Sequence, residues 1–290
     1  MTRYYGRLPK TEDARDFKAI PRAPHTGAFV DLSGNFPDAP YDQGSLGSCV
    51  SNGVAAALDF ARVKSHADPY DSPSRLFIYY NGRVLAGDPI DQDTGLQIRD
   101  GFKAVATYGA PREIEWPYNV ARFADKPTNL TYLDALKDEA GIYGAVEQGS
   151  IDAMIASGYP VVFGFDVYDS FESAKTASTG IMSVPDLATE RLLGGHCVVA
   201  VSTPRDGSLC GGEPGVLYRK CRNSWGTGWG QSGHFWMPVE VMDGSECSDF
   251  WQVTTTKDAS APTPPAPSPT PVPTPAGCGW LSKILRALGL

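Results

Sequence analysis

The sequence predicts an α+β fold of two lobes, with a mainly helical first half and a mainly β second half. Apolar side chains recur at spacings of three and four, the period of an amphipathic helix, in residues 49–61, 74–85 and 97–108. Short apolar runs between turn residues, which are typical of strands, occupy residues 161–165, 197–201, 216–218 and 235–237. Two lobes of different class imply a cleft between them, and clefts are common places for a site.

The other predicted elements are shorter. Residues 1–28 are polar and interrupted by prolines, which predicts an extended leader rather than a packed element. A short strand is expected at residues 29–32. Two further helices are expected around residues 132–140 and 150–157.

Composition excludes several classes of function. The net charge of -8 and the pI near 5.0 argue against a nucleic-acid partner, for which a basic surface is the first expectation. The 6 cysteines form no C-x-x-C pair and the histidines are isolated, so we expect neither a metal site nor a cofactor. We find neither a secretory signal nor a membrane-spanning run, so a cytoplasmic location is the default expectation, with leaderless export left open.

Residues 41–58 contain the first candidate catalytic residue. Cys49 lies where a Gly/Ser-rich loop meets an alanine-rich apolar segment, so a helix should begin there. The unpaired backbone N–H groups and the positive dipole end at the start of this helix would lower the pKa of the Cys49 thiol, and Ser48 could cap the helix. The Gln43 side chain offers a donor for a negative oxygen formed when a thiolate attacks a carbonyl. Alone, a cysteine at a helix start is more often a small buried hydrophobic residue.

Two later residues could complete a catalytic group. His196 follows two glycines and precedes a strand, with more open surroundings than His25, His66 or His234. Asn223 begins a loop dense in Gly and Trp, and its side-chain carbonyl could orient an imidazole. Taken separately, these residues are a structural histidine and a turn former.

Taken together and in chain order, Gln43, Cys49, Gly195-His196 and Asn223-Ser224-Trp225-Gly226 resemble the papain family of cysteine proteases, with a layout similar to its bacterial members. The resemblance spans roughly residues 29–253. Shorter runs add to it: Thr94-Gly95, Tyr108-Gly109, Trp116-Pro117-Tyr118 and Pro160-Val161-Val162.

This resemblance implies a papain-like two-lobe fold, with a helical left lobe, an antiparallel β-barrel right lobe and the active site in the cleft between them. The expected domains are an inhibitory leader at 1–28 and a catalytic domain at 29–255. Within the catalytic domain, the left lobe would cover about 41–145 and the right lobe about 146–255.

The same resemblance implies the roles of the site residues. Cys49 would be the nucleophile, His196 the base and later the acid, and Asn223 the residue that orients His196. Gln43 would donate to the oxyanion. Substrate-binding positions would be Gly95, Gly164, Met182, Gly194, Gly195 and Trp225, with Gly164, Gly194 and Met182 near the pocket for the second residue before the cut.

Two positions depart from the family pattern. Leu46 stands where most members have a half-cystine, and Val50 replaces the usual aromatic residue after the nucleophile. The missing cystine suggests a reducing compartment or tolerance of one. Cys197 and Cys221 lie on strand-like runs that could be neighbours, and a bond between them is left open.

The predicted activity is endopeptidase action on proteins or peptides through a thiolate and imidazolium pair and a thioester acyl-enzyme. One alternative is a non-catalytic peptide-binding protein that keeps the fold. Another is acyl transfer to or from a different substrate. We expect the leader to lie across the cleft as an intramolecular inhibitor, against the alternative of an amino terminus without a role.

The carboxyl-terminal part has a different character. Residues 256–277 form a proline-rich linker that should be extended. In residues 278–290 the apolar side chains fall on one helical face, which suits a membrane surface, a docking site on another protein, or a frayed tail.

Overall fold

The computed structural model describes residues 4–11, 13–14, 16–21, 24–65, 72–137 and 142–255. His66, the linker at 256–277 and the helix expected at 278–290 lie outside the described residues. None of the described helices is both long enough and apolar enough to cross a membrane.

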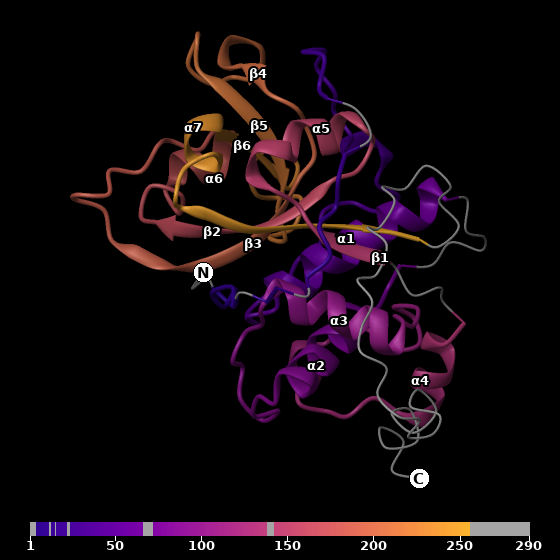
Figure 1. The fold of residues 1–290 in the computed structure, drawn as a ribbon. Coiled ribbons are helices and arrows are strands. Elements are labelled where there is room, and N and C mark those ends of the chain that lie inside the picture. Colours follow the sequence, from indigo (N-terminus) through magenta and orange to yellow (C-terminus); the bar gives the residue numbers. More distant parts are fainter. Residues whose placement is uncertain are drawn as a thin grey trace.

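Helix α1 (Cys49–Lys64) is the central element. Every residue from Cys49 to Arg62 is buried, so the helix is covered on all sides rather than on one face. It packs against α2 (Arg75–Ala86) and α3 (Ile98–Tyr108) on one side and against strands of the sheet on the other. Figure 1 shows α1 between these two groups of elements. The chain can pack this closely because the helix is rich in alanine.

The helices begin and end at residues with suitable local chemistry. Ser74 caps α2 by accepting a hydrogen bond from the Phe77 N–H, and Gly87 ends that helix in the left-handed conformation. Helix α4 spans Asn129–Ala135, so the expected start near residue 132 is wrong by three positions. The reason is Thr128, whose hydroxyl accepts from the Thr131 N–H and starts the helix earlier.

The remaining helices are short. The α-helices are α5 (Ile151–Ala156), α6 (Ala174–Thr179) and α7 (Val239–Met242). The 3-10 helices are η1 (Ser33–Asn35), η2 (Val120–Arg122), η3 (Gln148–Ser150) and η4 (Gly207–Leu209).

The second half of the chain forms a curled antiparallel sheet, the element that the sequence predicts as a barrel. Its seven strands run in the order β1-β7-β2-β3-β5-β4, and β6 pairs with β5. The strands are β1 (Ile142–Ala145), β2 (Val161–Tyr168), β3 (Leu192–Ala200), β4 (Arg205–Asp206), β5 (Leu217–Arg222), β6 (His234–Pro238) and β7 (Cys247–Thr254). One continuous hydrophobic core contains residues of α1 and of the central strands, so the helices and the sheet share it.

Two expectations about strands need correction. Residues 29–32 form no strand: Asp31 makes a single antiparallel bridge with Ser202 before the chain turns into η1. Strands β1, β4 and β7 were missed by the sequence pattern, although β7 is an interior strand of the sheet, paired on both sides. The β7 segment mixes polar and apolar residues without clear alternation, and its identity as a strand comes from its neighbours β1 and β2.

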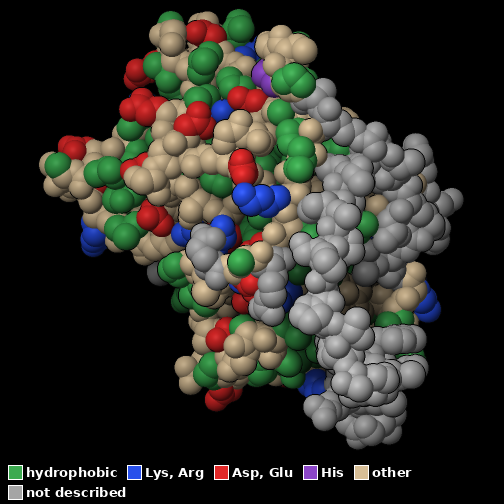
Figure 2. All heavy atoms as spheres, in the orientation of Figure 1, with side chains coloured by type: hydrophobic (Ala, Val, Ile, Leu, Met, Phe, Trp, Pro, Cys, Tyr) green, Lys and Arg blue, Asp and Glu red, His purple; other side chains and the backbone are tan. Residues whose placement is uncertain are grey.

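The amino-terminal segment enters between the helices and the sheet, where Figure 1 shows it in indigo. Its backbone joins both sides, because Leu8 N–H donates to the Leu96 carbonyl and Arg7 N–H donates to the Gly195 carbonyl, each at 3.0 Å. Figure 2 shows acidic, basic and hydrophobic side chains interspersed over the described part of one face. Residues 4–8 are called the cleft segment below.

The buried imidazole of His234 on β6 makes stability dependent on pH. Burial, together with the charges of Lys220 and Arg222, lowers the pKa of His234 to about 4. Because the unfolded chain has the ordinary pKa of about 6.5, it binds more protons than the folded chain below that pH. The stabilisation is complete above pH 6.5 and is lost as pH falls toward 4.

We therefore predict that His234→Asn removes this pH dependence. An Asn amide can still donate to the Ser232 carbonyl, which the His234 Nδ1 contacts at 3.2 Å. The free energy of unfolding is measured with urea at pH 7 and at pH 4.5. Its decrease between the two pH values should be roughly 2–3 kcal/mol smaller in the variant than in the parent. His25→Asn, a change in the partly exposed leader, is the control. Equal losses in all three proteins would contradict the assignment.

Candidate active site

Cys49 is the first residue of α1 and is fully buried. Burial raises the pKa of its thiol, while the backbone N–H groups of Gly6, Cys197 and Val50 act in the opposite direction. The net direction is opposite to the lowered pKa expected from the helix start, because the cleft segment covers the sulfur and excludes water. Ser48 also departs from expectation, since its side chain makes no capping hydrogen bond to the helix.

His196 lies in the middle of β3 and is fully buried. Its Nε2 lies 2.8 Å from Oδ1 of Asn223, which follows β5. The next residue along β3, Cys197, directs its backbone N–H at the Cys49 sulfur. The structure thus brings the start of α1, the middle of β3 and the end of β5 together at one point.

Trp225 covers the imidazole. The two rings stack with centroids 4.9 Å apart and an interplanar angle of 24°. Trp229 and Phe171 pack against Trp225 in turn, with ring centroids 5.0 and 5.4 Å away. This aromatic group keeps water away from the hydrogen bond between His196 and Asn223.

The orientation of the Gln43 side chain follows from its partners. Its Oε1 accepts a hydrogen bond from the Ser224 hydroxyl at 2.6 Å, and its Nε2 donates to the carbonyls of Leu46 and Tyr4 at 2.9 and 3.1 Å. Backbone pairing between Gln43 N–H and the Ser224 carbonyl joins the two loops. Consequently Nε2 points into the cleft as a fixed donor.

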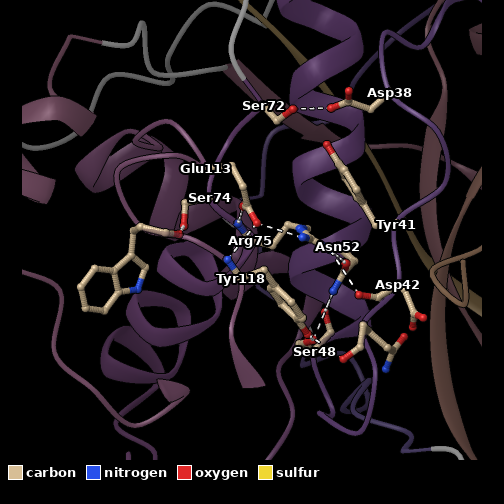
Figure 3. Close-up of polar contacts among 12 residues, drawn as sticks. Asp38, Tyr41, Asp42, Ser48, Asn52, Ser72, Ser74, Arg75, Glu113 and Tyr118 are labelled. Atoms are coloured by element: carbon tan, nitrogen blue, oxygen red, sulfur yellow. Dashed lines mark hydrogen bonds and ion pairs between the residues drawn. The ribbon is translucent and has the colours of Figure 1, made fainter. Parts of the chain in front are cut away.

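A polar network holds the loop that precedes α1. Tyr118 donates from its hydroxyl to the Gln43 carbonyl at 2.8 Å, and this hydroxyl lies 2.5 Å from Oγ of Ser48. Because the phenol has one proton, Ser48 is the donor in that second contact. Figure 3 shows Arg75 extending this network between Glu113 and Asn52, whose side chain donates to the Ser48 carbonyl.

The cleft segment passes over the candidate catalytic residues. The Tyr4 carbonyl accepts from Gln43, and the Gly6 N–H faces the Cys49 sulfur. The Tyr5 ring lies edge-on to His196, with centroids 6.1 Å apart. Leu96 N–H donates to the Gly6 carbonyl at 2.7 Å.

Glycines line the path of the segment. A side chain at Gly95 would overlap Gly6, and a Cβ at Gly194 would lie 2.8 Å from that of Tyr5. A Cβ at Gly195 would lie 2.7 Å from the Arg7 carbonyl oxygen. Three glycines expected near substrate therefore lie against the amino-terminal segment, and the backbone that pairs with it is that of Leu96, one residue beyond Gly95.

Arg7 fills a pocket beside this path. Its side chain occupies the space that a side chain at Gly164 would take, and it reaches Asp166 on β2 and Ser248 on β7. Met182, by contrast, is a core residue whose backbone N–H donates to the Trp236 carbonyl. Its predicted place near the pocket stays a prediction.

Neither a disulfide nor a cluster of metal ligands is found among the described residues. Cys197 and Cys221 are both buried and both free, so they form no disulfide. Within the same residues, no three His, Cys, Asp or Glu side chains are grouped so that they could hold a metal ion.

Sequence reasoning missed three residues that position the site. Ser224 and Tyr118 lie inside the runs that carry the family resemblance, so those runs could have indicated them. Asp93 accepts from the Gly47 N–H at 2.8 Å and so holds the loop before Cys49. No local pattern marks it, because it is an acidic residue in a polar loop.

Comparison with protein families and curated proteins gives a consistent result. The family model "Papain family cysteine protease" matches residues 39–255. A relative from Acanthamoeba polyphaga mimivirus, an uncharacterized peptidase C1-like protein, is 38% identical over 229 residues, covering 75% of this chain and 70% of the relative.

Solved structures agree. Xylellain, a cysteine protease from Xylella fastidiosa, aligns with a TM-score of 0.76 and 34% identity over 88% of this chain and 99% of its own. The fold of digestive procathepsin L 3 from Tenebrio molitor is similar, with a TM-score of 0.62 and 18% identity over 82% of this chain and 73% of its own. The family match across most of the chain, the similar relative and the shared fold show that this chain belongs to the papain family of cysteine proteases and is a cysteine peptidase.

Proposed function

We propose that the chain is an endopeptidase in which Cys49, His196, Asn223 and Gln43 carry the reaction, and that its amino-terminal segment keeps it latent. The observation that carries this proposal is the convergence of three groups at one point. These are the buried thiol of Cys49, the imidazole held by Asn223, and the Gln43 amide aimed into the cleft.

In the proposed reaction, the Cys49 thiolate attacks the carbonyl carbon of a peptide bond. The carbonyl oxygen becomes negative and accepts a hydrogen bond from Gln43 Nε2. His196 then gives a proton to the leaving nitrogen as the C–N bond breaks, which leaves a thioester on Cys49. Water attacks the thioester, gives one proton to His196, and releases the acid and the thiolate.

Asn223 would set the role of each imidazole nitrogen. Its Oδ1 also accepts from the Ser224 N–H at 2.8 Å, so this oxygen is fixed in position and acts as an acceptor. His196 Nε2 must therefore carry a proton to bond to it. Proton exchange with Cys49 then falls to Nδ1.

Latency is supported by the register of the cleft segment. Gln43 binds the Tyr4 carbonyl, whereas the group facing the sulfur is the Gly6 N–H, two residues away. A thiolate attacks a carbonyl carbon and not an N–H, so the bound segment offers no bond for cleavage in this register. The raised pKa of the covered thiol also disfavours the thiolate.

Tethering would strengthen this inhibition. The cleft segment and Cys49 belong to one chain, so the effective concentration of the segment at the cleft is on the order of millimolar. In this arrangement the register around Gly6 protects the segment from cleavage.

A labelling experiment separates the proposed enzyme from a non-catalytic peptide-binding protein with the same fold. A chain that begins at residue 27, and so lacks the cleft segment that covers Cys49, is treated with an epoxysuccinyl cysteine-protease inhibitor, and the modified residue is mapped by mass spectrometry. Modification at Cys49 that is lost in His196→Ala supports catalysis. Labelling of other cysteines alone would contradict it.

The Gln43 side chain gives a graded prediction. Gln43→Ala should lower kcat about a hundred- to a thousandfold, because it removes one donor to the developing oxyanion. Ser224→Ala should lower kcat only about tenfold, because it removes the hydrogen bond that orients the amide and leaves the donor in place. Both are measured on a small fluorogenic peptide under saturating conditions in a chain that begins at residue 27, because Gln43 also binds the cleft segment. An unchanged kcat in Gln43→Ala would exclude it from the reaction.

Gly6 gives a test of latency that keeps the full chain. A methyl group at Gly6 would overlap the Gly47 carbonyl, so Gly6→Ala should displace the cleft segment and raise the initial rate of peptide hydrolysis. The matched control is Gly34→Ala, since a Cβ there meets no atom within 4 Å.

The same assay is applied to a chain that begins at residue 27, with autocleavage of the full chain excluded by mass. We expect the rate of Gly6→Ala to approach that of the shortened chain. Equal initial rates for the parent, Gly6→Ala and the shortened chain would refute latency while leaving the catalytic assignment intact.

A further inference from the structure

The geometry points to a pocket that selects a basic substrate side chain, with the carboxyl group of Asp166 as its recognition element. The inference rests on the proposed function and adds the substrate class. It starts from the residue that fills this pocket in the latent chain.

Arg7 occupies the pocket as a substrate side chain would. Its backbone N–H donates to the Gly195 carbonyl, beside His196, and it follows Gly6, which faces the Cys49 sulfur. The pocket therefore lies within a residue or two of the bond that would be cut. The Arg7 side chain is only 6% exposed, although it carries a charge.

Charged and polar groups compensate for this burial at two of the three guanidinium nitrogens. Nη1 of Arg7 lies 3.5 Å from Oδ1 of Asp166, and Nη2 donates to the Ser248 hydroxyl, while Nε has no hydrogen-bond partner among the described residues. A buried guanidinium without such partners would carry a large desolvation cost. The pocket is thus built for a cation and not for a hydrocarbon side chain.

Asp249 follows Ser248 on β7 and is a second carboxyl group near this pocket. It is 5% exposed, and its Oδ1 accepts from Trp251 Nε1 at 2.5 Å, while Oδ2 has no hydrogen-bond partner among the described residues. Burial raises the pKa of Asp249, while the hydrogen bond from Trp251 and, after it, the charge of Arg7 act against this shift.

Asp249 has an uncommon backbone conformation. Its φ of 63° lies in the left-handed region, which is uncommon for a residue other than glycine. Glycine at position 164 makes the space in the pocket, because a side chain there would overlap the Arg7 guanidinium. The absence of a side chain at Gly164 leaves room for a long basic group.

A set of fluorogenic peptides tests the inference in the full chain. The peptides differ only in the second residue before the scissile bond, which is arginine, lysine, citrulline or leucine. Citrulline has nearly the shape of arginine and no charge, so the ratio of kcat/KM for arginine to citrulline measures charge recognition. Latency does not affect this ratio, because the fraction of molecules with an open cleft multiplies both kcat/KM values equally.

We expect arginine to exceed citrulline and leucine at least about tenfold, the effect of one hydrogen bond between charged groups. Asp166→Asn should reduce the arginine-to-citrulline ratio about tenfold. Asp169→Asn, at an exposed residue paired with Arg191, is the charge-matched control.

A second measurement uses inhibition. The protein is the full chain carrying Arg7→Ala, in which the pocket is vacated. Two synthetic peptides of residues 1–11 are added to it as inhibitors, one with the natural Arg7 and one with citrulline at position 7, and their Ki values are compared. Citrulline should weaken inhibition about tenfold, and Asp166→Asn should remove the difference.

The inference is overturned if citrulline or leucine peptides are cleaved as well as the arginine peptide, or if Asp166→Asn leaves the ratio unchanged. If either outcome is found while hydrolysis still depends on Cys49, only this inference fails and the proposed function stands. Failure to cleave any peptide, or hydrolysis that survives Cys49→Ala, overturns the proposed function and this inference together.

Discussion

The geometry of the site depends on the close packing of α1 against the sheet. A Cβ at Gly53 would lie 3.1 Å from Sγ of Cys197, and one at Gly101 would lie 3.1 Å from side-chain methyl groups of Val50 and Val54. Glycine at these positions, with alanine along the helix, allows α1 to contact both β3 and α3 directly. Because close-packed interiors yield little, this contact fixes Cys49 relative to the strand that carries His196.

Hydrogen bonds around the loop before α1 hold the groups that packing alone does not orient. Ser224 fixes the Gln43 amide, and Tyr118 fixes the Gln43 carbonyl. Burial raises the pKa of Tyr118 to about 12, so its phenol remains a donor throughout the range in which the protein would act. Preorganised donors of this kind need no reorganisation when charge develops on a substrate.

The glycines that would admit a substrate backbone also admit the amino-terminal segment. Gly95, Gly194 and Gly195 leave room for a peptide to approach closely, and residues 4–8 occupy that room in this structure. If the proposed latency holds, inhibition and substrate recognition share one surface. Under the proposals above, the pairing of Arg7 with Asp166 would connect them, because the group that anchors the segment would be of the kind that the pocket selects in a substrate.

The sequence alone determined what local patterns can encode. Helical periodicity predicted α1, α2 and α3, apolar runs predicted β2, β3, β5 and β6, and the runs around Cys49, His196 and Asn223 indicated the family. Tertiary structure decided whatever depends on residues far apart in the chain: β7 as an interior strand between β1 and β2, the partners of Gln43, and the raised pKa of the Cys49 thiol under Gly6. Periodicity reports only the neighbours within a turn or a strand, whereas burial, register and electrostatics are set by segments that meet after folding.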